Sequence, residues 1–126
     1  MGMYEICVQA EFSAAHALRG YPGDCARTHG HNWTVEVFLK CEKLNELGIG
    51  VDFRDVKQAI HTILKDFDHQ HLNELAIFKD DNPTSEILAK YFYGQLGQKL
   101  NTDDLKISKV RVSESRDTGI LYWEET

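Results

Sequence analysis

Three histidines near the start of the chain have the residue type and spacing of metal ligands. His29 and His31 stand at positions i and i+2 of a segment that reads as the beginning of a strand, so their side chains project from one face about 6.5 to 7 Å apart. Gly30 leaves the opposite face bare, and His16 follows an earlier strand closely enough for all three rings to meet. Three neutral imidazoles with no cysteine among them are typical of a catalytic zinc site, whose fourth position stays open.

Cys25 lies four residues before His29 and leaves two interpretations open. Its thiolate could complete a closed, four-ligand structural site, or it could stand beside the metal as a base. Structural zinc sites usually take their cysteines in close pairs, and this chain has no C-x-x-C. The open site is therefore the favoured interpretation. Cys7 and Cys41 fall within alternating apolar patterns and are interpreted as packing residues.

Asp68 and His69 form a second group of titratable residues, just after a predicted helix. A carboxylate that accepts from one ring nitrogen fixes the tautomer of the imidazole and raises the basicity of the other nitrogen, so the pair could relay protons. The other interpretation is a helix carboxyl terminus, where His69 and His71 complement the negative end of the helix dipole. Taken alone, the stretch favours this second interpretation.

Glu114 is unusual because it continues the apolar face of a predicted strand. Val110, Val112 and Glu114 alternate onto one face, so the carboxylate emerges where the apolar side of the sheet ends. A carboxylate in that place needs a partner. It could pair with Arg116 or another cation in a structural bridge, or it could accept from adjacent N–H donors of a planar ligand.

These residues must be positioned by the elements that the hydrophobic pattern predicts. Alternation of apolar and polar residues predicts two long strands before the middle of the chain and a hairpin at its end. The two long strands cover residues 4–12 and about 32–41, and the hairpin strands lie within 106–115 and 119–125.

Apolar residues at helical spacing predict two helices between these pairs of strands, within 51–67 and 82–100. Asp52 can cap the first helix, and Thr84 or Ser85 can cap the second. Phe53 is expected on the apolar stripe of the first helix. The order ββααββ predicts an α+β fold, a four-stranded antiparallel sheet with two helices on one face, whose open edges favour pairing with another copy.

Length and composition bound the class of protein. A chain of 126 residues predicts a single domain over 1–126. A net charge of −6 argues against a sequence-independent hold on nucleic acid, and no apolar run reaches the roughly 20 residues that span a bilayer. An odd number of cysteines without a signal segment favours a reducing, cytoplasmic location.

Five motifs, taken together and in order, resemble the 6-pyruvoyl-tetrahydropterin synthase superfamily, and most closely its bacterial branch of 6-carboxytetrahydropterin synthases. The resemblance covers nearly the whole chain. It implies a T-fold (tunnelling fold) subunit that assembles into a homohexamer, a dimer of trimers, with active sites between subunits. It also implies a zinc cofactor and a pterin triphosphate substrate. The motifs are FSAAH, CARTHGH, DHQHLN, NPTSE and VSES.

The resemblance implies roles for the residues around the metal. His16 in the F-x-A-A-H match, and His29 and His31 in the H-G-H match, correspond to zinc ligands. Cys25 corresponds to the catalytic proton acceptor, acting as a thiolate whose pKa a nearby cation must lower. The resemblance thus agrees with the open site favoured by the spacing of the histidines.

The resemblance also implies roles for residues farther along the chain. Asp68 and His69 correspond to a proton-relay dyad, and Glu114 corresponds to the anchor of the pterin ring. Further pterin contacts are implied for the NPTSE motif, at Thr84, Ser85 and Glu86.

An acidic protein needs local positive charge to bind a triphosphate. Arg27, beside the cysteine, and Arg19 are the candidates, although an exposed, solvated arginine is the ordinary alternative.

The activity implied is that of a zinc-dependent carbon–carbon lyase of the queuosine pathway. It would convert 7,8-dihydroneopterin triphosphate to 6-carboxytetrahydropterin, with release of acetaldehyde and triphosphate. The three-residue gap ART between the cysteine and H-G-H is similar to the carboxy-forming branch. Two alternatives stay open: elimination of triphosphate without side-chain cleavage, which gives 6-pyruvoyl-tetrahydropterin, and a non-catalytic zinc- or pterin-binding protein.

Overall fold

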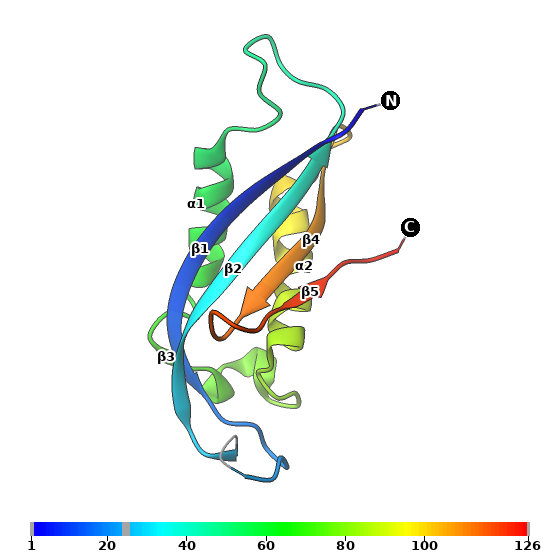
Figure 1. Ribbon diagram of the computed structural model, residues 1–126. Coiled ribbons are helices and arrows are strands. Elements are labelled where there is room, and N and C mark those ends of the chain that lie inside the picture. Colours follow the sequence, from blue (N-terminus) through cyan, green and yellow to red (C-terminus); the bar gives the residue numbers. More distant parts are fainter. Residues whose placement is uncertain (1, 24–25, 126) are drawn as a thin grey trace.

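The centre of the computed structural model, which describes residues 2–23 and 26–125, is a twisted five-stranded sheet (Figure 1). Its strands lie in the order β3-β1-β2-β4-β5. Two helices, α1 (Phe53–Leu64) and α2 (Ser85–Leu100), lie side by side behind the sheet. The strands are β1 (Tyr4–His16), β2 (His29–Cys41), β3 (Gln70–His71), β4 (Leu105–Ser113) and β5 (Ile120–Tyr122).

The two longest strands form an antiparallel ribbon that carries the candidate metal ligands at one end. β1 and β2 are 13 residues each and pair without a break from Tyr4 opposite Cys41 to His16 opposite His29. Apolar side chains alternate onto one face, which fixes this register because a slip of one residue would turn every side chain over. The predicted strands are confirmed, and both extend farther than predicted toward the histidines.

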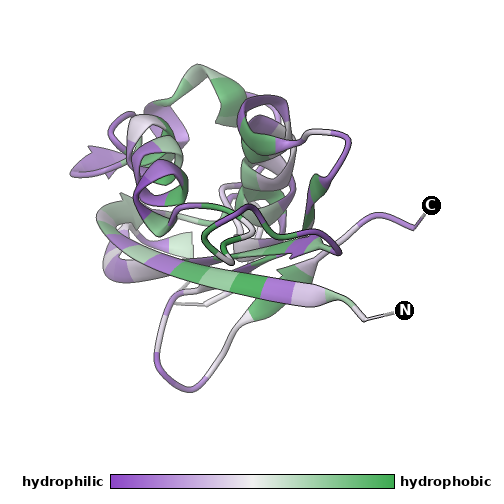
Figure 2. Ribbon diagram, turned by 90° about the horizontal axis from the view of Figure 1, so that it is seen from above, coloured by the Kyte–Doolittle hydropathy of each residue, from purple (hydrophilic) through white to green (hydrophobic). Residues whose placement is uncertain are grey.

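The helices begin at the predicted caps and cover only one face of the sheet. The Asp52 carboxylate accepts from the backbone N–H of Arg54, and the Thr84 hydroxyl accepts from that of Ile87. Figure 2, seen from above, shows both helices on the same side of the sheet, which makes two layers. None of the helices in the described part of the chain is long and apolar enough to cross a membrane.

The hydrophobic core lies between the sheet and the helices. Val35, Val37 and Leu39 of β2 are fully buried there, as are Leu88 and Phe92 of α2. Burial of a side chain of this size stabilises the fold by roughly 1.5 to 3 kcal/mol. The buried inner face of the ribbon is therefore a rigid support for the histidines at the ends of β1 and β2.

Two expectations about packing are wrong. Phe53 is 60% exposed, because as the first residue of α1 it lies at the end of the helix, beside Ile49 of the preceding loop, rather than over the sheet. Cys7 is exposed on the outer face of β1, whereas Cys41 is buried as predicted. The outer face of the sheet has no helix above it, so alternation there does not imply packing.

The sheet has one more strand than predicted, and it is not wholly antiparallel. β3 pairs in parallel with β1, with Ala14 opposite Gln70 and Ala15 opposite His71. A strand of two residues has no periodicity of its own, and its place is fixed by contacts made after folding. The order of the four predicted strands and the two helices is confirmed, with β3 inserted between the helices.

Candidate metal centre and active site

The ends of β1 and β2 bring three imidazole rings together. His16 and His29 are directly opposite each other in the ribbon, and His31 lies on the same face as His29. The ring centroids are 4.6 Å apart for His16 and His29, 5.2 Å for His16 and His31, and 4.9 Å for His29 and His31. With a carboxylate oxygen of Glu114, one donor atom of each residue lies within 4.8 Å of all the others. We call these four residues the histidine–glutamate cluster.

Backbone carbonyls orient two of the rings. His16 Nδ1 lies 2.8 Å from the carbonyl oxygen of Pro83, and His29 Nδ1 lies 2.7 Å from that of Arg27. A carbonyl can only accept, so each Nδ1 carries the hydrogen and each Nε2 keeps its lone pair. This is the arrangement by which proteins fix the tautomer of a metal-bound histidine.

The surroundings of His16 keep the ring neutral. The side chain is 1% exposed, and burial lowers the pKa of His16, against the opposing effects of the Pro83 carbonyl and the Glu114 carboxylate. The ring packs at 4.9 Å against Trp33, whose indole N–H donates to the carbonyl of Ala14. A neutral imidazole is the form that binds a metal, and packing against Trp33 holds this ring in place.

Buried atoms without partners indicate that the cluster fits a metal ion. His16 Nε2 and His31 Nε2 are both buried and have no hydrogen-bond partner. Leaving such atoms unpaired costs about 1 to 3 kcal/mol each, and an ion held between them would remove that cost. A set of imidazole and carboxylate donors suits zinc, among other divalent metals.

Glu114 enters the cluster from the end of β4. Its Oε2 lies 3.1 Å from His31 Nε2, and its Oε1 accepts from the hydroxyl of Ser85 at 3.3 Å. The carboxylate thus lies against His31 and accepts a hydrogen bond from Ser85. The register of β2 and β4 explains this position: Thr34 pairs with Ser113, so the residue that follows β4 continues onto the inner face beside Trp33.

Asp68 and His69 form a pair at the edge of β1. Asp68 Oδ1 accepts from the backbone N–H of Ser13 at 2.9 Å, and Asp68 Oδ2 lies 3.1 Å from His69 Nδ1. The Ser13 N–H is the main reason that the pKa of Asp68 is lowered, and His69 adds to it. α1 ends at Leu64, and the backbone N–H of Asp68 donates to the Leu64 carbonyl at 2.9 Å, so the pair directly follows the end of the helix.

His69 is held in an unusual backbone conformation. Its φ of 60° lies in the left-handed region, which no other described residue except glycine occupies. The side chain is 80% exposed, so packing of the ring does not impose this conformation. The backbone N–H of His69 donates to the carbonyl of Ser13, and this bond together with the parallel pairing of β3 holds the turn.

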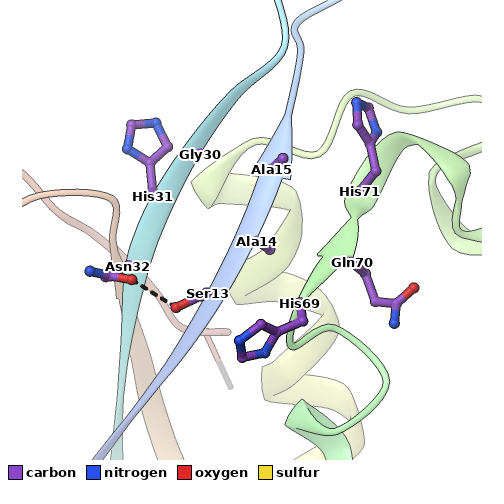
Figure 3. Close-up of a pocket in the computed structure, with 9 residues that line it drawn as sticks. All are labelled: Ser13, Ala14, Ala15, Gly30, His31, Asn32, His69, Gln70 and His71. Carbon is purple, nitrogen blue, oxygen red and sulfur yellow. Dashed lines mark hydrogen bonds between the residues drawn. The ribbon is translucent and has the colours of Figure 1, made fainter.

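A cavity of about 530 Å³ opens beside the dyad (Figure 3). Ser13 and Ala15 point to the face of β1 opposite to His16, and Asn32 and Gly30 point to the same outer face of β2. In Figure 3 the His31 ring extends from β2 away from β1, whereas His69 and His71 extend from the segment beside β1. The lining residues are Ser13, Ala14, Ala15, Gly30, His31, Asn32, His69, Gln70 and His71.

The dyad and the metal cluster are separate groups within one chain. The cluster packs against Trp33 on the inner face of the ribbon, and the dyad lies beside Ser13 at the edge of β1, although His31 and His69 both line the cavity. Among the residues that the structure describes, no hydrogen bond or ring contact joins His69 to any of the three clustered histidines.

The remaining predicted site residues have different surroundings. Thr84 is engaged as the cap of α2, whereas Glu86 and Arg27 are exposed. The Arg19 guanidinium donates to the backbone carbonyls of Phe78, Lys79 and Asp81, which leaves it tied to a loop rather than free for a ligand. Cys25 lies outside the described residues.

Sequence reasoning missed the contacts that backbone groups make. The carbonyls of Pro83 and Arg27 orient two of the histidines, and the N–H of Ser13 anchors Asp68. It also missed the contact between the Thr28 hydroxyl and His71 Nε2 at 3.1 Å, which joins the segment before His29 to β3. Backbone partners leave no mark on residue type, so no motif could have revealed them.

Comparison with known proteins places these features in a family. The sequence model of the family described as 6-pyruvoyl tetrahydropterin synthase matches residues 5–125. The 6-carboxy-5,6,7,8-tetrahydropterin synthase of Bacillus subtilis is 32% identical over 124 residues, which cover 94% of this chain and 82% of the relative. The dihydroneopterin monophosphate aldolase of Pyrococcus furiosus is 29% identical over 119 residues, which cover 94% of this chain and 96% of the relative.

A solved structure extends the likeness to three dimensions. The 6-pyruvoyl tetrahydropterin synthase of Caenorhabditis elegans matches with a TM-score of 0.88 and 25% identity, over 99% of this chain and 98% of that one. The α+β fold with a five-stranded sheet and two helices is thus shared along the whole chain.

Proposed function

Because this chain belongs to the 6-pyruvoyl tetrahydropterin synthase family, we propose that it is a zinc-dependent 6-carboxy-5,6,7,8-tetrahydropterin synthase. It would convert 7,8-dihydroneopterin triphosphate to 6-carboxytetrahydropterin and release acetaldehyde and triphosphate. The name of the Bacillus subtilis relative supports this reaction. The observation that carries the proposal is the pair of buried Nε2 atoms without partners, on His16 and His31.

The residues that would hold zinc are His16, His29 and His31. The carbonyls of Pro83 and Arg27 leave the Nε2 lone pairs of His16 and His29 free for this purpose. A zinc ion in this place would supply Lewis acidity toward the hydroxyl groups of the substrate side chain.

Two groups of the chain would move protons. Cys25, as a thiolate, would accept a proton from carbon. His69 would exchange protons with the substrate through Nε2, since Asp68 engages its Nδ1. A positioned acid–base group of this kind contributes typically about 10²- to 10⁴-fold to the rate.

Other side chains would bind the substrate. The Glu114 carboxylate would accept from adjacent N–H donors of the pterin ring, in the manner of a carboxylate that binds an arginine fork. Thr84, Ser85 and Glu86 lie at the start of α2, where Ser85 contacts Glu114, and would add contacts to the pterin. Exposed Arg27 would receive the triphosphate.

We propose that the complete active site forms between copies of the chain in a homohexamer, a dimer of trimers. The lack of a hydrogen bond or ring contact between the dyad and the cluster in the described chain supports this, because a second copy could bring its dyad to the cluster. The open edge of β1 supports it as well: β3 covers only Ala14 and Ala15 of that strand within the described chain. A thiolate base also requires a reducing location, which favours the cytoplasm.

The test is incubation of the zinc-loaded protein with 7,8-dihydroneopterin triphosphate, followed by mass spectrometry of the products. We expect 6-carboxytetrahydropterin and acetaldehyde. Accumulation of 6-pyruvoyl-tetrahydropterin without acetaldehyde would replace the proposal with the runner-up reaction, which the name of the nematode structure favours. A parallel incubation with dihydroneopterin monophosphate tests the reaction named for the Pyrococcus furiosus relative.

Two variants separate the proposed thiol base from the metal site. Cys25→Ala should keep zinc and the fold but lose turnover, whereas His31→Ala should lose zinc. Wild-type turnover by Cys25→Ala would contradict the role of the thiol. Lack of turnover of any pterin triphosphate by the zinc-loaded wild type would leave a binding protein.

A further inference from the structure

Glu114 holds one carboxylate oxygen inside the group of three histidines. Its Oε2 lies 3.1 Å from His31 Nε2, and the four donor atoms of the histidine–glutamate cluster all lie within 4.8 Å of one another. Donor atoms at the corners of a tetrahedral zinc site are about 3.3 Å apart when the bonds to the metal are about 2.0 to 2.1 Å long. Glu114 and His31 therefore already have the spacing of two ligands of one ion.

A hydrogen bond does not account for this close approach. His31 Nε2 is buried and has no hydrogen-bond partner, although the Glu114 oxygen is 3.1 Å away. The direction of approach is thus wrong for an N–H···O bond, which weakens steeply as it bends. Two lone-pair donors directed at a shared cation account for both the distance and the missing bond.

Glu114 is held far less firmly than His16. Its other oxygen accepts from Ser85 at 3.3 Å, beyond the usual range of about 2.5 to 3.0 Å for an O–H···O bond, and its side chain is 32% exposed. His16, by contrast, is 1% exposed and held by a 2.8 Å bond to Pro83. Backbone carbonyls fix His16 and His29, whereas the carboxylate can leave toward solvent.

We propose that Glu114 is a displaceable fourth ligand of the metal. Its carboxylate completes the site in the free protein and leaves when another ligand takes the fourth position. This inference rests on the proposed function for the presence of a metal, and it gives a second role to the residue proposed to anchor the pterin ring. The two roles alternate, because a carboxylate engaged in the cluster does not face a pterin, so an incoming substrate competes with Glu114.

Cobalt(II) with imidazole as a neutral competing ligand tests this without any pterin. Cobalt affinity is measured by competition with a chelator, and imidazole binding by the visible spectrum of the cobalt protein. We expect Glu114→Gln to bind cobalt at least about tenfold more weakly than the wild type, and its cobalt form to bind imidazole at least about tenfold more tightly. Glu36→Gln is the matched control, with the same change of charge on the outer face of β2, and should behave as the wild type.

Glu114→Ala covers the case in which the amide oxygen of the glutamine takes the place of the carboxylate. Unchanged cobalt and imidazole affinities in both variants, with the fold checked by circular dichroism, would overturn the inference. Failure of the proposed function is a separate result: a wild type that turns over no pterin could still pass this test, and an active enzyme could still fail it.

Discussion

The histidine–glutamate cluster and the Asp68–His69 dyad are built in opposite ways. The cluster lies at the end of the hydrophobic core, where His16 is 1% exposed and rests on Trp33. The dyad lies at a sheet edge, with the His69 side chain 80% exposed and its backbone at a φ of 60°. All four residues of the cluster come from one chain, whereas the His69 ring is open to solvent in that chain. The cluster therefore has the build of a binding site, whereas the dyad has the build of an exposed proton-transfer group.

The largest effect is expected where the cluster loses a fixed ligand. His16→Ala should weaken zinc binding more than about 100-fold and abolish turnover, because it removes a neutral, oriented imidazole that Glu114 cannot replace. Chelator competition measures the affinity. His61→Ala, which removes an exposed histidine of α1, is the control and should bind zinc as the wild type does. Equal affinities would mean that the metal lies elsewhere.

The dyad should show the reverse pattern. His69→Ala should lose about 10²- to 10⁴-fold in turnover while its zinc content and affinity stay unchanged, because the dyad has no contact with the cluster in the same chain. Steady-state kinetics and metal analysis of one preparation measure both. Loss of zinc along with turnover would show that the two regions are not independent.

Mixing two inactive variants sharpens the comparison further. If each site takes its cluster from one copy and its dyad from another, unfolding and refolding His31→Ala together with His69→Ala should restore about a quarter of the wild-type activity in an equal mixture. In an equal mixture half of the clusters and half of the dyads are intact, so about one site in four combines an intact cluster with an intact dyad. No recovery, with mixed oligomers present by mass spectrometry, would place both groups in a single chain.

The cluster and the dyad also differ in how well they could be predicted from the sequence. Apolar and polar residues alternate strictly along the long ribbon. Val35, Val37 and Leu39 therefore predict both the strand and its buried side. Because His29 and His31 continue this alternation, their convergence with His16 could be predicted as well. The features that lie on the core face were accessible because one physical rule governs them.

The dyad follows no such rule. β3 is two residues long, and the left-handed turn at His69 occurs at a residue type that seldom adopts it. Both are fixed by tertiary contacts with Ser13 and with β1, which local sequence does not encode. The place of Glu114 beside His31 depends on the pairing between β2 and β4, so it could be predicted only once that register was known.

A smaller effect is expected in the pH dependence of stability. The Ser13 N–H lowers the pKa of Asp68 below its unfolded value, so the ionised carboxylate stabilises the fold above about pH 4, and this contribution is lost as the pH falls through the lowered pKa. Asp68→Asn should lose less stability than the wild type between about pH 5 and pH 3. Urea unfolding at the two pH values measures it. A parallel loss in both proteins would mean that other carboxylates carry the acid sensitivity.

The smallest effect is expected in a pair of variants that tests the backbone conformation of His69 separately from the chemistry of its ring. Every residue with a Cβ is strained at the φ of 60° that His69 adopts, whereas glycine is not. His69→Gly should therefore be more stable than His69→Ala by about 0.5 to 1 kcal/mol, even though glycine loses more entropy on folding. Both variants lack the imidazole, so both should be inactive, and urea unfolding compares them directly. A more stable alanine variant would mean that the turn relaxes when the ring is removed, and that the ring, rather than Ser13 and β3, holds the left-handed conformation.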